Sequence, residues 1–182
     1  MNKEELDILI KQHLLWLKRP STESSGQRLI INRAELQGCD LQGVNLELGY
    51  LRHSNLQGAN LINCFAQRVD LQNCILFEAD LSYSFMQYAN LRGVNLQGAN
   101  LQGANLIFTD MMNSNLQDAN LEGADLTSAN LAHSDLRGAN LRGTKIESTY
   151  LVGATVRRRD LPWLFLHPKF SEFYPTLEVS DD

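Results

Sequence analysis

Apolar side chains recur in this sequence at a fixed spacing of five residues. From Leu36 to Leu151 every fifth position is apolar, and 20 of these 24 central positions are Leu; the others are Ala66, Met86, Met111 and Ile146. A period of five matches neither the 3.6-residue period of a helix nor the two-residue alternation of a strand. The pattern therefore predicts many copies of one short unit, stacked as a solenoid.

The positions around each centre also have fixed preferences. Two residues before it, all 24 side chains are Val-sized or smaller; one residue before it, 17 are Asn or Asp; two residues after it, 10 are Gly. Residues two apart in an extended segment share a face, so the small residue and the centre point inward and the Asn or Asp points outward. The next two residues turn the chain, where Gly tolerates a positive φ. We expect the outward Asn and Asp to hydrogen-bond to the backbone of these turns.

The pattern, clearest from Ala89-Asn90-Leu91-Arg92-Gly93 through Ala104-Asn105-Leu106, resembles the A(D/N)LXX repeat of the pentapeptide-repeat family over residues 34–156. The resemblance implies an all-β solenoid, a right-handed quadrilateral β-helix with four repeats in each of about six coils. At about 4.8 Å per coil the rod would be roughly 29 Å long. Many relatives come from bacteria, especially cyanobacteria.

The chain is expected to have three parts: an N-terminal helix and cap segment (1–33), the repeats (34–156) and a C-terminal tail (157–182). Residues 3–19 are predicted to form an amphipathic helix, with Asn2 and Glu5 as a capping box and Pro20 as its end. It is expected to cap the first coil; a membrane-surface helix is the alternative, but its charges are mixed rather than basic. The tail is expected either to cover the last coil or to form a homodimer contact. It is rich in aromatic and proline residues: Pro162, Trp163, Phe165, Pro168, Phe170, Phe173 and Tyr174.

The charge and the cysteine content limit the kinds of partner and the cellular location that we expect. The chain has 16 Lys and Arg against 21 Asp and Glu, a net charge of −5, which disfavours direct binding of nucleic acid through phosphates. No secretion signal and no apolar run long enough to span a bilayer is visible, so no membrane association is expected. Three cysteines without a CxxC motif fit a reducing compartment. The expected location is the cytoplasm.

No set of residues predicts catalysis. Cys39, Cys64 and Cys74 all fall at the small inward position, which indicates packing rather than metal or redox chemistry. The histidines do not converge, and there is no phosphate-binding Gly loop and no HExxH. We therefore expect no catalytic residues, no metal and no cofactor, and a protein that is not an enzyme.

Outward positions become apolar between residues 62 and 112. In the four-sided geometry that the resemblance implies, residues 20 apart stack, so Phe65 lies above Phe85 and Tyr88 above Phe108. The candidate partner surface, flanked by Gln67, Arg68 and Gln87, consists of Leu48, Phe65, Phe85, Tyr88, Ile107 and Phe108. An exposed aromatic patch indicates a partner surface. The alternatives are that the tail or another subunit covers it, or that degenerate repeats tolerate it.

The leading hypothesis is a noncatalytic protein-interaction module that uses one wall of a rigid rod, with an unidentified protein as partner. A second is a DNA mimic that interacts with or protects a topoisomerase such as gyrase, as some relatives do. Residues 36–156 carry 11 Asp and Glu against 6 Lys and Arg. That is one net charge per roughly 6 Å, against one per about 1.7 Å in duplex DNA. A third hypothesis is a structural homo-oligomer assembled through the tail.

Overall fold

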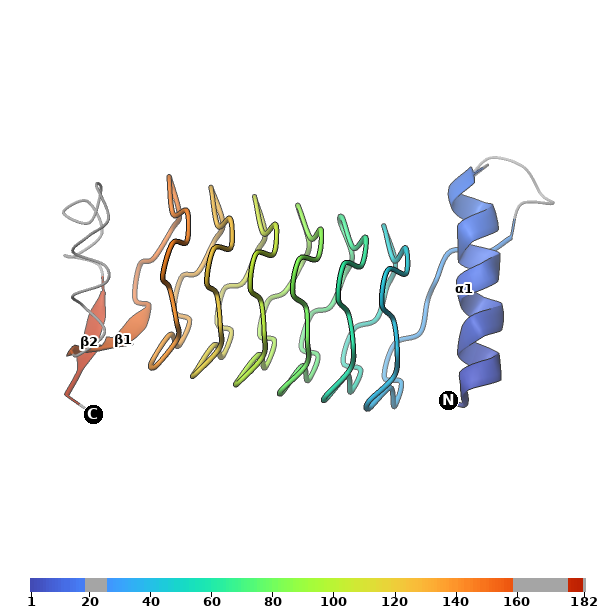
Figure 1. Ribbon diagram of the computed structural model, residues 1–182, viewed down its shortest axis with the longest axis horizontal. Coiled ribbons are helices and arrows are strands. Elements are labelled where there is room, and N and C mark those ends of the chain that lie inside the picture. Colours follow the sequence, from blue (N-terminus) through green and yellow to red (C-terminus); the bar gives the residue numbers. More distant parts are fainter. Residues whose placement is uncertain (19–25, 159–176, 182) are drawn as a thin grey trace.

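The repeats form a rod of stacked coils, with a helix at one end and a two-stranded sheet at the other (Figure 1). This computed structural model describes residues 1–18, 26–158 and 177–181. Its elements are α1 (Lys3–Lys18), β1 (Thr155–Arg157) and β2 (Glu178–Ser180). No helix in these described segments is long and apolar enough to cross a membrane.

Neighbouring coils are joined by parallel bridges between residues 20 apart, from Ile30↔Tyr50 to Asp135↔Thr155. Twenty residues are four five-residue repeats, as the family resemblance implies. Each bridge residue donates to one neighbouring coil, and the residue after it donates to the other. For example, the Asn120 amide donates to the Ala99 carbonyl at 2.9 Å and the Leu121 amide to the Asn140 carbonyl at 2.9 Å. The chain thus forms a β-solenoid in which the same position of every fourth repeat lies in one column along the rod.

The interior is filled by the two inward positions of each repeat. Most central Leu side chains are fully buried, and so are most of the small residues two positions earlier, such as Ala99 and Ala104. Burying one Leu stabilises the fold by about 1.5–3 kcal/mol, and this gain recurs in every repeat. Close packing of the large centres explains why the second inward side chain has to be small.

The outward Asn and Asp residues support the turns, as predicted. All 17 of them accept a hydrogen bond from the backbone amide two residues further on; one example is Gln102 N–H to Asn100 Oδ1, at 3.2 Å. Many also form side-chain hydrogen bonds along their column. The side-chain Nδ2 of Asn100 donates to Asp80 Oδ1 at 3.1 Å, and that of Asn120 donates to Asn100 Oδ1 at 3.1 Å. The outward carboxylates and amides are thereby explained by the fold itself.

The second turn residue of every repeat has a positive φ. Ten of these positions, from Gly38 to Gly153, are glycines, and fifteen, including Arg33 just before the first of the 24 repeats, are other residues with φ between 54° and 62°. A side chain in this left-handed conformation costs roughly 1–2 kcal/mol. The 20-residue coil therefore requires this conformation whether or not the sequence supplies a glycine.

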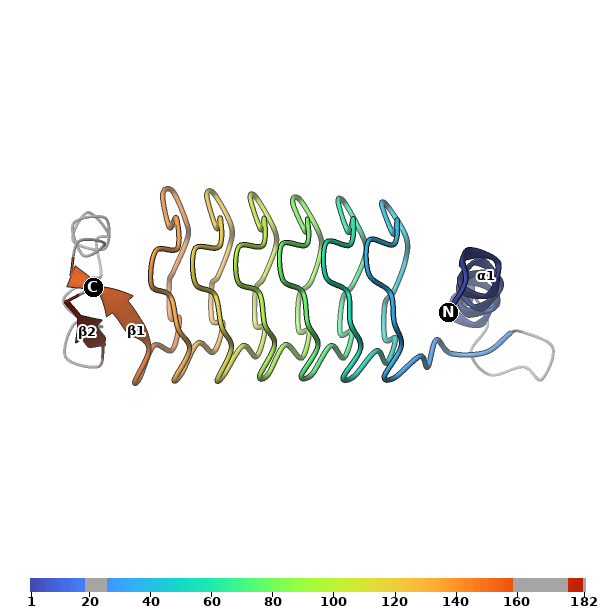
Figure 2. The same ribbon diagram turned by 90° about the horizontal axis from the view of Figure 1, so that it is seen from below.

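At the N-terminal end α1 lies across the first coil (Figures 1 and 2). Leu6 is buried, and Leu9 and Ile10 pack against the core. The predicted capping box is present, since the Asn2 amide donates to Glu5 at 3.0 Å and the Glu5 amide to Asn2 at 2.9 Å. The described helix runs to Lys18, and Arg19 and Pro20, where its end was predicted, lie outside the described residues.

At the C-terminal end β2 adds one more layer. It pairs in parallel with β1, placing Val179 beside Val156, and Glu178 N–H donates to the Ala154 carbonyl at 2.8 Å. Leu177 packs against the end of the core. Residues 177–180 therefore cover part of the last coil. The tail residues from Pro162 to Tyr174, for which a cap or a dimer contact was expected, lie outside the described residues.

His13 joins α1 to the first coil. Its side chain is fully buried, and Nδ1 accepts the Leu29 amide at 3.1 Å. Nε2 makes no hydrogen bond of normal geometry with the described residues. Burial, assisted by the positive charge of Arg28, lowers the pKa of His13, although the nearby backbone of Glu47 partly opposes this. The ring is therefore neutral in the folded protein, because a proton on Nδ1 would point at the Leu29 N–H.

This contact predicts acid sensitivity of the N-terminal cap. A histidine whose folded pKa lies below the unfolded value stabilises the fold above about pH 6.5 and loses that contribution as the pH falls. In urea denaturation at a series of pH values, the free energy of unfolding of the wild type should therefore decrease below about pH 6.5. His13→Gln, which keeps an acceptor but cannot be protonated, should show a smaller decrease; an equal decrease would contradict the role assigned to His13.

Candidate aromatic interaction face

The aromatic residues predicted to stack do so on one side of the rod. We call this side the aromatic face; it is built by the repeats centred on Leu46, Ala66, Met86 and Leu106. The Phe65 and Phe85 ring centroids are 5.3 Å apart with an interplanar angle of 7°, and those of Tyr88 and Phe108 are 5.2 Å apart, also at 7°. Two short aromatic columns thus run along the rod side by side.

Four of the six predicted surface residues are exposed. The exposed fraction is 44% for Phe65, 38% for Phe85, 54% for Tyr88 and 51% for Phe108, whereas Leu48 and Ile107 are half-buried. The Arg68 guanidinium lies 5.6 Å above the Tyr88 ring, and it makes no ion pair within the described part of the chain. The face therefore combines aromatic rings with a cation that has no acidic partner there.

Phe65 and Phe85 occupy positions where most repeats have Asn or Asp. Replacing that side chain removes the oxygen that accepts the backbone amide two residues later. As a result, the backbone N–H groups of Gln67 and Gln87 have no hydrogen-bond acceptor among the described residues. Each lost hydrogen bond of this kind costs about 0.5–1.5 kcal/mol.

Tyr88 and Phe108 occupy the turn position that favours glycine. Their φ values are 62° and 57°. Large aromatic residues are uncommon in this conformation because their Cβ approaches the following carbonyl. The aromatic face therefore carries backbone strain that glycine, present at 10 of the 25 equivalent turn positions, would relieve.

The layer beneath the rings is also atypical. The centres behind Phe65 and Phe85 are Ala66 and Met86 instead of Leu. The buried side-chain oxygens of Ser84 and Gln87 have no hydrogen-bond partner in the part of the chain that the structure describes. Buried polar groups without partners are rare in folded proteins, and each costs about 1–3 kcal/mol. Similar departures occur on other walls, for example at Ile75 and Ser114, but on this face they coincide with stacked, exposed aromatic rings, a combination that is typical of a functional site.

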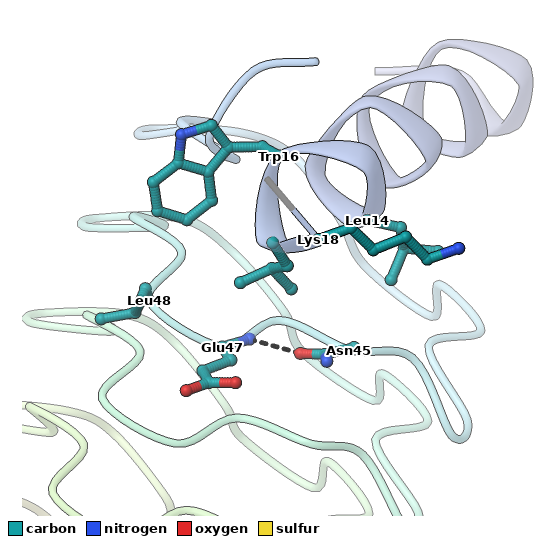
Figure 3. A pocket seen from close by; sticks show the side chains of 7 residues that line it. Leu14, Trp16, Lys18, Asn45, Glu47 and Leu48 are labelled. Carbon is teal, nitrogen blue, oxygen red and sulfur yellow. Dashed lines mark hydrogen bonds between the residues drawn. The ribbon is translucent and has the colours of Figure 1, made fainter. Parts of the chain in front are cut away.

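A pocket of about 410 Å³ lies at the N-terminal end of the aromatic face, between α1 and the first coil (Figure 3). Leu14, Trp16, Leu17 and Lys18 line it from the helix, and Asn45, Glu47 and Leu48 line it from the coil. The pocket explains why Leu48 is only half-buried. Leu14 lies within the helix predicted over residues 3–19, and Leu48 was predicted at this end of the face, but the pocket between them was not predicted.

Arg28 fixes the coil side of the pocket. Its Nε donates to the Leu48 carbonyl at 2.5 Å, and its guanidinium lies 3.8 Å from the centroid of Tyr50 and 5.7 Å from that of Trp16. A cation between two aromatic rings contributes roughly 0.5–2 kcal/mol. This arrangement holds the helix and the first coil in a fixed relation beside the face.

The described residues offer no catalytic constellation. Burial raises the pKa of both Cys64 and Cys74 to about 12, and that of Cys39 to about 11, so these thiols are poor nucleophiles. The Cys74 thiol donates to the Leu51 carbonyl at 2.9 Å. Within the described ranges, no group of three His, Cys, Asp or Glu side chains could hold a metal ion.

Comparison with known families identifies the repeat. Residues 50–87, 89–127 and 119–158 match the family described as pentapeptide repeats, with eight copies. The chain belongs to the pentapeptide-repeat family. Members of this family are in general structural or interaction proteins rather than enzymes. No curated protein matches the chain in sequence.

Several solved pentapeptide-repeat structures are similar to this chain. QnrB1, a plasmid-mediated fluoroquinolone resistance protein, matches with 20% identity and a TM-score of 0.62, over 70% of this chain and 72% of its own. A thylakoid-lumen protein from Arabidopsis thaliana matches with 32% identity and a TM-score of 0.48, over 57% of this chain and 68% of its own. Rfr23 from the cyanobacterium Cyanothece 51142 matches with 26% identity and a TM-score of 0.43, over 80% of this chain and 97% of its own. The likeness to QnrB1 establishes the β-solenoid fold.

The aromatic residues are predicted to be dispensable for folding. In the double variant Phe85→Asn/Tyr88→Gly, Asn restores an acceptor for the Gln87 amide and Gly relieves strain, which should offset the two lost ring stacks, each worth about 0.5–1.5 kcal/mol. We expect the free energy of unfolding in urea to stay within about 1 kcal/mol of the wild type.

The matched control is Ile75→Asn/Glu78→Gly, which changes the same two positions of the repeat centred on Leu76, on another side of the rod. It should be as stable as the wild type or more stable. A loss of more than about 3 kcal/mol in the Phe85→Asn/Tyr88→Gly variant alone would show that the rings support the fold instead of serving a partner.

Proposed function

We propose that this pentapeptide-repeat protein is a noncatalytic protein-interaction module and that the aromatic face binds its protein partner. One observation carries the proposal: lost turn hydrogen bonds, strained turn residues and unpaired buried oxygens coincide on that face. These features oppose stability, and the repeat rule offers Asn and Gly as simple replacements. Their combination with the stacked, exposed rings of Phe65, Phe85, Tyr88 and Phe108 is explained if a partner uses those side chains.

The composition of the face supports this proposal. Residues that dominate binding energy at protein interfaces are enriched in Tyr, Trp and Arg and cluster at the centre of the contact. Tyr88 with Arg68 above its ring forms such a centre, and Trp16 stands beside the pocket. The hydrogen-bonded coils fix these side chains in advance, which reduces the entropy lost on binding. The proposal includes a cytoplasmic location, which rests on the odd number of free cysteines.

The DNA-mimic alternative has weaker support. A mimic requires a dense row of free carboxylates, but five acidic residues of the rod form ion pairs: Asp70 with Arg52, Asp110 with Arg92, Asp118 with Arg157, Asp125 with Lys145 and Asp135 with Arg137. The likeness to QnrB1 concerns the fold alone. Assembly through the tail remains a proposal about residues outside the described ranges.

The proposal is tested by affinity capture with three forms of the full chain: wild type, Phe85→Asn/Tyr88→Gly and Ile75→Asn/Glu78→Gly. Proteins captured from a lysate of the source organism are quantified by mass spectrometry. We expect at least one partner to be retained by the wild type and the Ile75→Asn/Glu78→Gly control and reduced at least tenfold with the face variant, a loss of about 1.4 kcal/mol or more. Identical capture by all three forms would remove the aromatic face from the proposal.

A further inference from the structure

The backbone of the aromatic face limits how a partner can bind. Its bridging groups are already paired between coils: the Phe85 amide donates to the Cys64 carbonyl at 2.9 Å, the Met86 amide to Asn105 at 2.9 Å and the Tyr88 amide to Ile107 at 3.1 Å. An extended peptide therefore finds no free strand edge on this wall. Lying on aromatic rings, it would bury its own backbone groups without partners. A helix satisfies its backbone internally and avoids this problem.

Three polar groups without partners near the middle of the face are donors, although the Gln87 side-chain oxygen, an acceptor, is also unpaired among the described residues. The backbone N–H groups of Gln67 and Gln87 lack acceptors, and the Arg68 guanidinium has no carboxylate partner among the described residues. In 17 other repeats an Asn or Asp oxygen occupies the corresponding acceptor position. A partner that supplies carboxylate oxygens here would replace the acceptor oxygens that are missing because residues 65 and 85 are Phe instead of Asn or Asp. The chemistry of the face therefore matches an acidic ligand.

The spacing of these groups fits a helix that lies along the rod. Gln67 and Gln87 are one coil apart, about 4.8 Å, and one turn of an α-helix rises about 5.4 Å. Carboxylates at positions i and i+3 or i+4 of a helix share one face and follow this spacing. Over the three coil steps from Leu48 to Phe108 the mismatch accumulates to only about 2 Å.

We propose that the aromatic face binds an acidic amphipathic α-helix of the partner protein, an inference that rests on the proposed function above. Apolar residues of that helix pack on Phe85, Tyr88 and Phe108. Its carboxylates, one turn apart, accept hydrogen bonds from the amides of Gln67 and Gln87 and pair with Arg68. An apolar side chain at the end of the helix enters the pocket between Trp16 and Leu48.

The test is a peptide-display selection of random 16-residue peptides on the full-length chain, with counter-selection on Phe85→Asn/Tyr88→Gly. Enriched peptides should carry apolar residues at helical spacing and Asp or Glu at i and i+3 or i+4, and circular dichroism should show a gain of helix on binding. Arg68→Gln should weaken their binding at least fivefold, and more at low than at high salt. Ile75→Asn/Glu78→Gly should change the affinity less than twofold.

Three results would overturn the proposal that the face binds a helix. Face-dependent peptides that bind in an extended or proline-rich form would reject the helix and leave the proposed function standing. Peptides that bind the wild type and the face variant equally would reject the helix as well; if affinity capture were also unchanged, the proposed function would fail with it. Sedimentation of the wild type as a dimer, with Phe85→Asn/Tyr88→Gly a monomer, would assign the face to a second copy of the chain.

Discussion

The structure depends on the hydrogen bonds that join each coil to the next at a spacing of 20 residues. They allow the central Leu side chains to stack inside the rod, and they place the same position of every fourth repeat in one column. Because each coil is bonded to both neighbours, the backbone conformation of one turn is imposed on all others. Fifteen residues other than glycine accept a positive φ for this reason.

This rigidity separates the interior from the surface. The inward positions tolerate little variation, since a change in volume is felt by the coils above and below. The outward positions contribute mainly turn hydrogen bonds, worth about 1 kcal/mol each, so they can be exchanged at modest cost. The aromatic face, as we interpret it, is a place where several such exchanges were made together. A partner that supplies acceptors and covers the rings would recover part of the stability given up.

Much of this organisation could be predicted from the sequence because a strict repeat converts spacing into position. The inward Leu, the outward Asn and the stacking of Phe65 on Phe85 follow from the register and the 20-residue coil of the family. The start of α1 and its capping box follow from local rules. The candidate surface was found for the same reason, although its use by a partner is still a proposal.

Other features depend on contacts that α1 and β2, which lie outside the repeat pattern, make with the coils. The bond from Leu29 to the His13 ring, the pocket beside Leu48 and the Arg28 stack require knowing how α1 rests on the first coil. The pairing of β2 with β1 skips 23 residues instead of 20, so the register gave no sign of it. The unpaired Gln87 oxygen depends on the packing of its neighbours, which spacing alone does not determine.

The four-sided coil has a consequence for how such a protein can change length during evolution. Gain or loss of one five-residue unit would keep every Leu inside but rotate all later residues by a quarter turn, moving Phe108 to a different wall from Phe85. A duplication of 20 residues would lengthen the rod and leave each wall continuous. Selection for folding alone would accept both events, whereas selection for a binding wall would accept only whole coils.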